Sequence, residues 1–286
     1  MLPLRQAERR AHVIEDPVQT TIVIRNIETS EERELLIGAS SARNLTWEPS
    51  GDAVWFFGNG MRGHRGLHRV VLATGETEPV PVTLPSEFVA ILDARRIAFS
   101  PDGRTVYMLA VDRSQGSEAP HTVIAYDLET EATRRLYKTI VNANEAFGEG
   151  HVSVSPDGQT IAFMDRTRAA GDDVVLRVAP ADGSGEPRTV YRFPDGFRPT
   201  RRSNYEWTPD GQHILLAQRG NELSRITIVT IETGESVIVY ELQSTENGFI
   251  DGLRLDPTGR YVSFVAGRNL RELWVMEGLD ELDTSN

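Results

Sequence analysis

The sequence predicts an all-β protein, a β-propeller built from four-stranded antiparallel blades. Three observations predict it. A tight turn containing Pro-Asp-Gly or a close variant recurs five times at a regular interval, the prolines of these copies stand 48 to 55 residues apart, and apolar residues recur with period two on both sides of each copy. A small meander cannot bury both of its faces alone, so repeated meanders pack sheet on sheet around an axis.

The repeated turn is clearest at residues 99–104, Phe-Ser-Pro-Asp-Gly-Arg. Two close copies occupy residues 154–159 and 207–212, and looser copies occupy residues 47–52 and 255–260. Proline fixes φ near the value that the second position of a type I turn requires, aspartate or serine suits the third position, and glycine tolerates the position where the chain leaves. Each copy therefore predicts a tight connection between two strands.

The residues around the turn keep one register in all five copies. The positions two before the proline are Trp47, Phe99, Val154, Trp207 and Leu255; five after it are Val54, Val106, Ile161, Ile214 and Val262; seven after it are Phe56, Met108, Phe163, Leu216 and Phe264. Alternation with period two on both sides of a turn predicts a β-hairpin with one buried face. We expect the tryptophans and phenylalanines of this register to lie in the core.

Further strands follow each hairpin. The expected third strands are residues 70–72, 123–126, 174–176, 226–229 and 273–276, and in the first four units a turn and a fourth strand follow. Near the start, residues 21–27 and 34–37 match the second half of such a unit. We expect these N-terminal strands to join the last hairpin and close the ring, which gives five blades with one strand left over; a sixth, degenerate blade is the alternative.

The repeats run almost from end to end, which favours a single domain. We predict a tail or packed-over arm at residues 1–19, one propeller domain at residues 20–276 and an acidic tail at residues 277–286. No apolar run approaches membrane-spanning length, and the first ten residues lack the apolar core of a secretory signal. As written, the chain is expected to be cytoplasmic, or periplasmic if it is a mature or truncated form.

Composition excludes several classes of function. The formal net charge is -12 and the sequence pI is about 5.0. An acidic chain repels phosphate backbones, which argues against nucleic-acid and anionic-membrane binding. Cysteine is absent, so there is no disulfide framework, thiolate metal site or cysteine nucleophile. The composition leaves the oligomeric state open.

The repeated turn, followed by a β-branched and aromatic strand and then by an arginine-bearing loop, resembles the WD40-like (PD40) repeat of TolB-type propellers. The arginine loops here are residues 112–113, 165–166, 219–221 and 268–269. The resemblance covers about residues 20–276 and implies the fold. Relatives of this kind are described as periplasmic partner-binding modules, as gating propellers of prolyl-oligopeptidase-type peptidases and as oligogalacturonate lyases. This chain departs from them in lacking a signal peptide and in having five clear repeats where a TolB-type ring usually has six blades.

Two classes of enzyme require residues that can be sought in the sequence. A serine peptidase needs a second domain with a Gly-x-Ser-x-Gly elbow, which the sequence lacks. A metal-dependent sugar-acid lyase or hydrolase needs clustered histidines and carboxylates. His64 and His68, expected in the loop after a second strand, are weak metal candidates because no carboxylate is near them in sequence. We therefore predict no cofactor and favour a protein that is not an enzyme.

Arginines provide the better functional prediction. In a propeller, loops between second and third strands emerge on the same face as the connections between blades, and they surround one mouth of the ring. Guanidinium groups that converge there suit carboxylates or phosphates as ligands. The predicted partner-binding residues at this mouth are Arg62, Arg95, Arg96, Arg113, Phe147, Arg166, Arg198, Arg201, Arg202 and Phe249. Bonding to carbonyls or aspartates of a neighbouring blade is the structural alternative for each arginine.

Together these observations predict a binding scaffold for a protein or peptide partner. The alternatives are a metal-dependent sugar-acid lyase or hydrolase with its site at the mouth, and a propeller domain of a larger sensor or peptidase.

Overall fold

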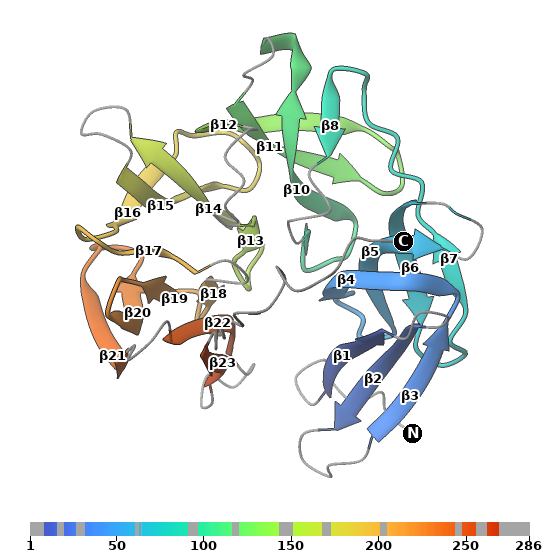
Figure 1. Cartoon of the computed structure of the whole chain (residues 1–286). Helices are drawn as coiled ribbons and strands as arrows, with labels where there is room; N and C mark the ends of the chain where they lie inside the picture. Colours follow the sequence, from blue (N-terminus) through green and yellow to red (C-terminus); the bar gives the residue numbers. More distant parts are fainter. Residues whose placement is uncertain are drawn as a thin grey trace, which may run out of the picture.

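The structure, a computed structural model, is a set of antiparallel sheets arranged around a common centre (Figure 1). It describes residues 9–15, 20–26, 32–60, 63, 65–90, 97–115, 120–142, 151–167, 173–200, 205–243, 248–255 and 262–268. In this part of the chain the helical content is one 3-10 turn, η2 (Arg113–Gln115), so no helix there is long and apolar enough to cross a membrane. The prediction of an all-β fold is confirmed.

Four sheets of the described chain have four or five strands and follow one another around the centre. The first contains β4 (Ala39–Trp47), β5 (Ala53–Gly60), β6 (Arg65–Val71) and β7 (Thr77–Pro79). The second contains β8 (Phe88–Ala90), β9 (Ala98–Phe99), β10 (Thr105–Asp112), β11 (Pro120–Asp127) and β12 (Thr133–Asn142). The third contains β13 (Ser153–Val154), β14 (Thr160–Thr167), β15 (Asp173–Pro180) and β16 (Arg188–Arg192). The fourth contains β17 (Arg198–Pro199), β18 (Tyr205–Trp207), β19 (His213–Arg219), β20 (Leu223–Thr230) and β21 (Ser236–Gln243).

Two smaller sheets lie at the ends of this arc (Figure 1). One contains β1 (Arg9–Glu15), β2 (Thr20–Asn26) and β3 (Glu32–Ile37), and the other contains β22 (Gly248–Leu255) and β23 (Val262–Arg268). The described chain thus has four complete blades, which differs from the predicted five or six. The expected closure of the ring by the N-terminal strands is not seen either, because β1–β3 form a sheet of their own. Within the predicted tail, residues 9–15 pair with β2 along their whole length; the expected strand at 273–276 and the acidic tail lie outside the described residues.

The polar residues of the repeated turn hold it in shape. In the third complete sheet the Ser155 hydroxyl donates to Asp157 Oδ1 at 2.6 Å and accepts the N–H of Thr160 at 2.9 Å, while Asp157 Oδ1 accepts the N–H of Gln159 at 2.9 Å. The same bonds recur in the copies at residues 100–105 and 208–213. Side chains therefore satisfy the backbone donors that the turn leaves unpaired, which explains why serine or threonine and aspartate flank the proline.

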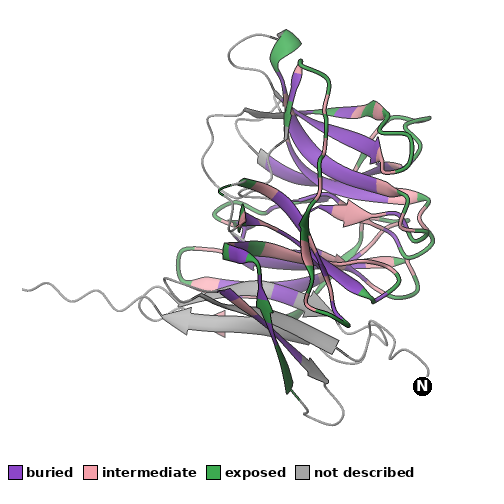
Figure 2. Ribbon diagram, turned by 90° about the vertical axis from the view of Figure 1, so that its right-hand side faces the viewer, coloured by how far each residue is buried: buried purple, intermediate pink, exposed green. Residues whose placement is uncertain are grey.

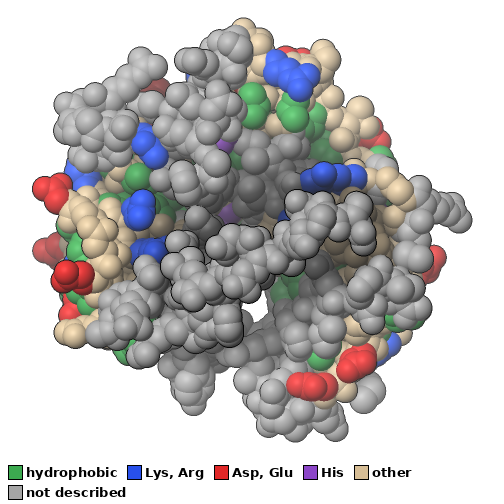
Figure 3. All heavy atoms as spheres, in the orientation of Figure 1, with side chains coloured by type: hydrophobic (Ala, Val, Ile, Leu, Met, Phe, Trp, Pro, Cys, Tyr) green, Lys and Arg blue, Asp and Glu red, His purple; other side chains and the backbone are tan. Residues whose placement is uncertain are grey.

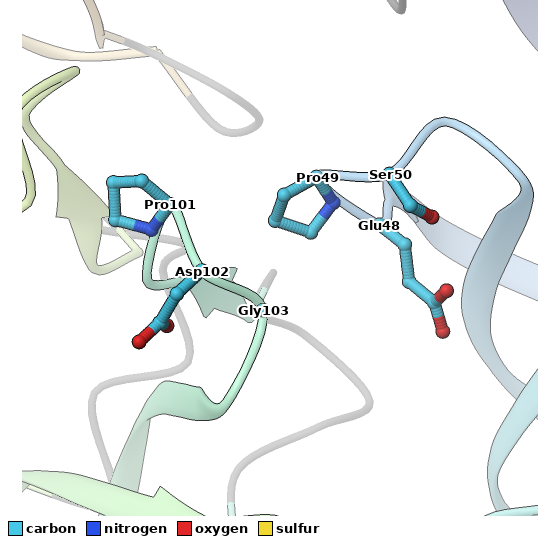
Figure 4. Close-up of a pocket in the computed structure, with 6 residues that line it drawn as sticks. All are labelled: Glu48, Pro49, Ser50, Pro101, Asp102 and Gly103. Atoms are coloured by element: carbon cyan, nitrogen blue, oxygen red, sulfur yellow. The ribbon is translucent and has the colours of Figure 1, made fainter. Parts of the chain in front are cut away.

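Successive turns also touch one another. A Cβ atom on Gly158, whose φ is +74°, would lie 2.7 Å from Cδ of Pro101 in the preceding turn. Equivalent positions on Gly103 and Gly211 lie 3.8 Å from Pro49 and 3.7 Å from Pro156. Figure 4 shows the turn that contains Pro49 beside the turn that contains Gly103, with the ring of Pro49 facing the neighbouring turn. The repeated turn is therefore a junction between sheets as well as a hairpin connection.

A second contact between sheets recurs at the outer strands. The turn between third and fourth strands of one sheet lies over the outer strand of the sheet before it. Arg33 on β3 donates to the carbonyl of Ala73 at 2.9 Å, Arg134 on β12 donates to the carbonyl of Asp182, and the Cβ position of Gly234 lies 3.1 Å from the Val190 carbonyl on β16.

The core lies between adjacent sheets, where Figure 2 shows buried residues along the strands and exposed residues at the turns. The positions five and seven after the repeated proline are buried in the four complete sheets, as predicted. Trp207 is buried as well, whereas Trp47 and Phe99 are half-buried at the edges of their clusters. The Phe264 side chain is not among those described.

The turn aspartates predict a dependence of stability on acid. The hydroxyl hydrogen bond, followed by the backbone N–H, lowers the pKa of Asp102, Asp157 and Asp210 below the usual value. A carboxyl with a lowered pKa in the folded state stabilises the fold above its unfolded pKa, about 3.9 for aspartate, and this contribution is lost as pH falls through the folded value. The urea midpoint should therefore fall between pH 5 and pH 2, and less steeply in Asp157→Asn. Asp195→Asn, at an exposed carboxyl outside the five repeated turns, is the control. Equal steepness in wild type and Asp157→Asn would refute this account.

Candidate functional site

The order of strands defines two faces of the molecule. In a sequential antiparallel meander the repeated turns and the turns between third and fourth strands emerge on one face. Loops between second and third strands and the connections between sheets emerge on the other, which we call the mouth face. In the orientation of Figure 1, Lys and Arg side chains lie around a central hollow that has histidines in its wall (Figure 3). The Asp and Glu side chains visible in this view lie mostly at the outer edge.

Three of the ten predicted partner-binding residues have described side chains. Arg113 is exposed in η2, Arg166 is half-buried on β14, and Arg198 is exposed on β17. They belong to three different sheets of the described chain. Phe249 lies on β22 without a described side chain, and the remaining six lie outside the described residues: Arg62, Arg95, Arg96, Phe147, Arg201 and Arg202.

Arg198 has a partner of like charge. β17 pairs with β19 so that Arg198 stands directly opposite Arg219. Directly opposed residues project to the same face of a sheet, where like charges destabilise each other. Within the described chain neither guanidinium takes part in an ion pair. Ser224 stands opposite Arg219 on β20, and its buried hydroxyl has no hydrogen-bond partner in that part of the chain. We call Arg198 and Arg219 the arginine pair.

On the other face of β19 and β20, side chains form a network of hydrogen bonds and one cation–π contact. Arg225 lies over the ring of Phe197, with its Cζ 3.8 Å from the ring centroid, and its Nε and Nη2 lie 3.3 and 3.2 Å from Oε1 of Gln218. The fully buried Gln218 donates from Nε2 to Tyr191 Oη at 2.9 Å and to Thr227 Oγ1 at 2.7 Å. This network holds β19 and the residue that precedes β17, and so fixes the backbone that carries the arginine pair.

Sequence reasoning missed this network, although a signal was present. Gln218 stands nine residues after a repeated proline, and Asp165 stands at the same place in the preceding unit. Both are polar residues that directly follow a run of four apolar residues within their strand. A polar residue in that place predicts a buried hydrogen-bonded or ion-paired group.

The Asp-Arg loops proved to contain buried ion pairs. Asp165 is 1% exposed; its Oδ2 lies 3.2 Å from Nε of Arg177 on β15, and its Oδ1 accepts the N–H of Arg166. Asp112 is fully buried, with Oδ2 2.7 Å from Nη2 of Arg135 on β12. The aspartates of residues 112–113 and 165–166 therefore bind arginines of other strands in their own sheets, and the arginine that follows each of them is left nearer the surface.

The histidines are mostly part of the core. His68 was expected in a loop, but it lies in β6, opposite Phe56 on β5, and its buried ring stacks on that phenylalanine with centroids 5.1 Å apart. β6 begins before Gly66, so that His68 lies within the strand, and the pairing of His68 with Phe56 turns the imidazole inward. His151, also buried, stacks on Tyr205 at 4.4 Å. His64 lies outside the described residues, and among those described no group of three His, Asp or Glu side chains could hold a metal ion.

A recess of about 440 Å³ lies between two repeated turns, on the face opposite the mouth (Figure 4). Among its lining residues is the half-buried Glu48, whose carboxylate accepts hydrogen bonds from Trp55 Nε1 at 2.6 Å and Arg69 Nε at 2.5 Å. Burial raises the pKa of Glu48, but the hydrogen bonds from Arg69 and Trp55 outweigh burial and leave the pKa below its usual value. This carboxylate is therefore charged and paired at neutral pH, which does not suit a general acid.

Sequential four- and five-stranded sheets around a centre, each with a repeated turn that packs against the turn of the next sheet, define a β-propeller. Its fold is TolB-like: TolB from Acinetobacter baumannii superimposes with a TM-score of 0.60 at 17% identity over 93% of this chain. The chain spans 65% of that TolB chain. An oligogalacturonate lyase from Vibrio parahaemolyticus gives 0.60 at 14% identity, covering 91% of this chain and 68% of the lyase. The β-propeller domain of Cps50 (Swd1) from Myceliophteria thermophila gives 0.53 at 11%, covering 92% and 91%. No family model and no curated protein matches the sequence. At these identities the likeness concerns the fold.

Proposed function

We propose that this propeller is a non-enzymatic scaffold that binds an acidic segment of a protein partner at its mouth face through the arginine pair. The observation that carries the proposal is the direct opposition of Arg198 and Arg219, without a carboxylate partner in the described chain. Two guanidinium groups on one side of a sheet repel each other until an anion lies between them. A carboxylate does this with paired N–H donors, and such charge-assisted bonds are among the strongest polar contacts.

A short acidic segment fits better than an extended polyanion. The net charge of -12 repels a long phosphate chain across the whole surface. At physiological ionic strength, charges more than about 8 Å apart are largely screened, so a short segment responds mainly to the two arginines beside it. Rigid support from Arg225 and Gln218 reduces the entropy that binding must overcome, because the strand ends are already ordered.

An enzyme acting on an acidic sugar is the alternative, since one similar structure is named an oligogalacturonate lyase and guanidinium groups also suit sugar carboxylates. Of its two candidate metal ligands, His68 is taken up by core packing against Phe56. This favours the scaffold. The compartment, and whether the chain is a domain of a larger sensor or peptidase, stay predictions.

The test is binding of a fluorescent peptide of eight glutamates, measured by anisotropy at low and at physiological salt. Wild type should bind, more weakly at higher salt. Arg198→Glu and Arg219→Glu should each weaken binding about tenfold or more, because each charge-assisted bond contributes about 1.5 to 3 kcal/mol. Arg188→Glu is the matched control, since the exposed Arg188 begins β16 on the opposite face. If the double variant binds as wild type does, the proposal is wrong.

A further inference from the structure

The outer strand β21 (Ser236–Gln243) exposes a continuous apolar run. Val237 is 65%, Ile238 47%, Val239 50% and Tyr240 41% exposed. Successive residues of a strand point to opposite faces, so both faces of this strand are accessible. β21 is also the last strand in the hydrogen-bonding order of its sheet, after β17, β19 and β20.

Other long outer strands do not share this property. β3 buries Leu35 and Ile37, β12 buries Tyr137 and Thr139, and β16 buries Val190 and Tyr191. A turn of the following sheet lies over each of these three strands, as described above for Arg33, Arg134 and Gly234.

Most of β21 lacks the usual protection against pairing with another strand. Proteins usually protect sheet edges with charged residues or proline, or with a bulge. Residues 236–240 contain neither charge nor proline. The protective features of β21 are a bulge at Val239, which is the extra residue between the partners of Ile226 and Thr227, and the charge of Glu241 near the end of the strand. Exposed, apolar and extended backbone at a sheet edge is the arrangement that binds peptides by strand addition, in which main-chain hydrogen bonds give affinity and alternate side chains give specificity.

We propose that β21 binds an extended segment of another protein by strand addition, and that this segment alternates apolar residues and has Lys or Arg at its ends. The charges around β21 are the reason to expect Lys or Arg at the ends of the segment. Glu232, Glu235 and Glu241 are exposed around the strand, and residues 226–243 contain no basic residue. Arg225 stands opposite Glu241 on β20, but its guanidinium is held by Gln218 and the Phe197 ring. An apolar centre with acidic ends is complementary to an apolar centre with basic ends. This site is independent of the arginine pair, which takes a ligand of opposite charge.

Charge also disfavours a second copy of this chain as the occupant. Antiparallel pairing of two β21 strands would bring Glu235 and Glu241 of one copy near those of the other, between two molecules of net charge -12. A basic segment meets no such repulsion.

The experiment uses the full chain and a labelled nine-residue peptide in which valine alternates with threonine and lysine stands at each end. The peptide should bind and should slow hydrogen exchange at β21 amides. Val237→Lys and Val239→Lys should each weaken binding at least tenfold. Leu36→Lys, which removes another exposed apolar side chain (57% exposed, on β3), should leave it unchanged. A peptide with its alternate backbone nitrogens methylated should not bind, because it cannot form the ladder.

Three results would overturn the proposal. The methylated peptide could bind as well as the parent, which would mean side-chain contact without strand addition. Sedimentation could show a wild-type dimer that Val239→Lys dissociates, which would assign β21 to a second copy. Binding could be absent in the full chain and appear after deletion of residues 269–286, which would assign the strand to this chain's own C-terminal segment.

Discussion

Replacing Asp165 with leucine is expected to lower the free energy of unfolding by about 3 kcal/mol. Asp165 is 1% exposed and pairs with Arg177, whose side chain is 24% exposed. Removal of the carboxylate leaves that guanidinium without its counter-charge and the N–H of Arg166 without its acceptor. The cost of breaking a buried pair is about 3 to 5 kcal/mol, and we expect the lower end because Arg177 reaches solvent in part. Urea unfolding at pH 7 measures the change.

A double variant separates the broken pair from simple loss of packing. Arg177→Met alone should also be destabilising, because it removes the guanidinium that pairs with the buried Asp165 carboxylate. Asp165→Leu combined with Arg177→Met should cost much less than the sum, since apolar residues of similar volume often replace a buried pair without loss. Asp195→Leu at an exposed position is the control. Additive single effects, or a change below about 0.5 kcal/mol in Asp165→Leu, would contradict a structural ion pair at this position.

Replacing Gly158 with alanine is expected to cost about 3 kcal/mol. An L-residue at φ +74° costs about 1 to 2 kcal/mol, and a Cβ atom 2.7 Å from the Pro101 ring forces a shift that costs about 1 to 3 kcal/mol more. Thermal and urea unfolding give the size of the loss.

Gly196 provides a matched control for that substitution. Its φ is +80°, but nothing lies within 4 Å of its Cβ position. Gly196→Ala should therefore show the backbone cost alone, about 1 kcal/mol. Pro101→Ala should relieve part of the cost of Gly158→Ala, because Cδ of the proline ring is the clashing atom. Equal losses in the two glycine variants would mean that successive turns do not touch.

Local chemistry explains why the hairpins and the core register were predictable. Serine, proline, aspartate and glycine specify a turn through bonds that span five residues, as Ser155 and Thr160 do. Period-two alternation then fixes which side chains face inward, so that Phe56, Phe163 and Leu216 are buried as expected.

Long-range pairing explains the errors. Residues 9–15 have no strong pattern of their own and become a strand through seven paired positions with β2. The blade count depends on how distant strands close the ring. His68 follows two glycines and was expected in a loop, but the register of β5 and β6 places it against Phe56.

The candidate site shows the same limit. Sequence placed Arg198 and Arg219 in two kinds of loop on one face but could not show that they stand directly opposite each other. Contact between Arg225 and Phe197 depends on the packing of β20 against the residue before β17, so it leaves no periodic signal.

Acidic ligands should bind at the mouth face beside β17 and β19, away from the repeated turns. Backbone amide shifts during titration with the peptide of eight glutamates test this binding site most directly. The amides of Arg198, Arg219 and Ser224 are expected to shift with a common affinity, while those of Gly103, Gly158 and Gly211 stay in place. Shifts confined to the three glycine turns, or none at β17 and β19 when the peptide is bound, would contradict it.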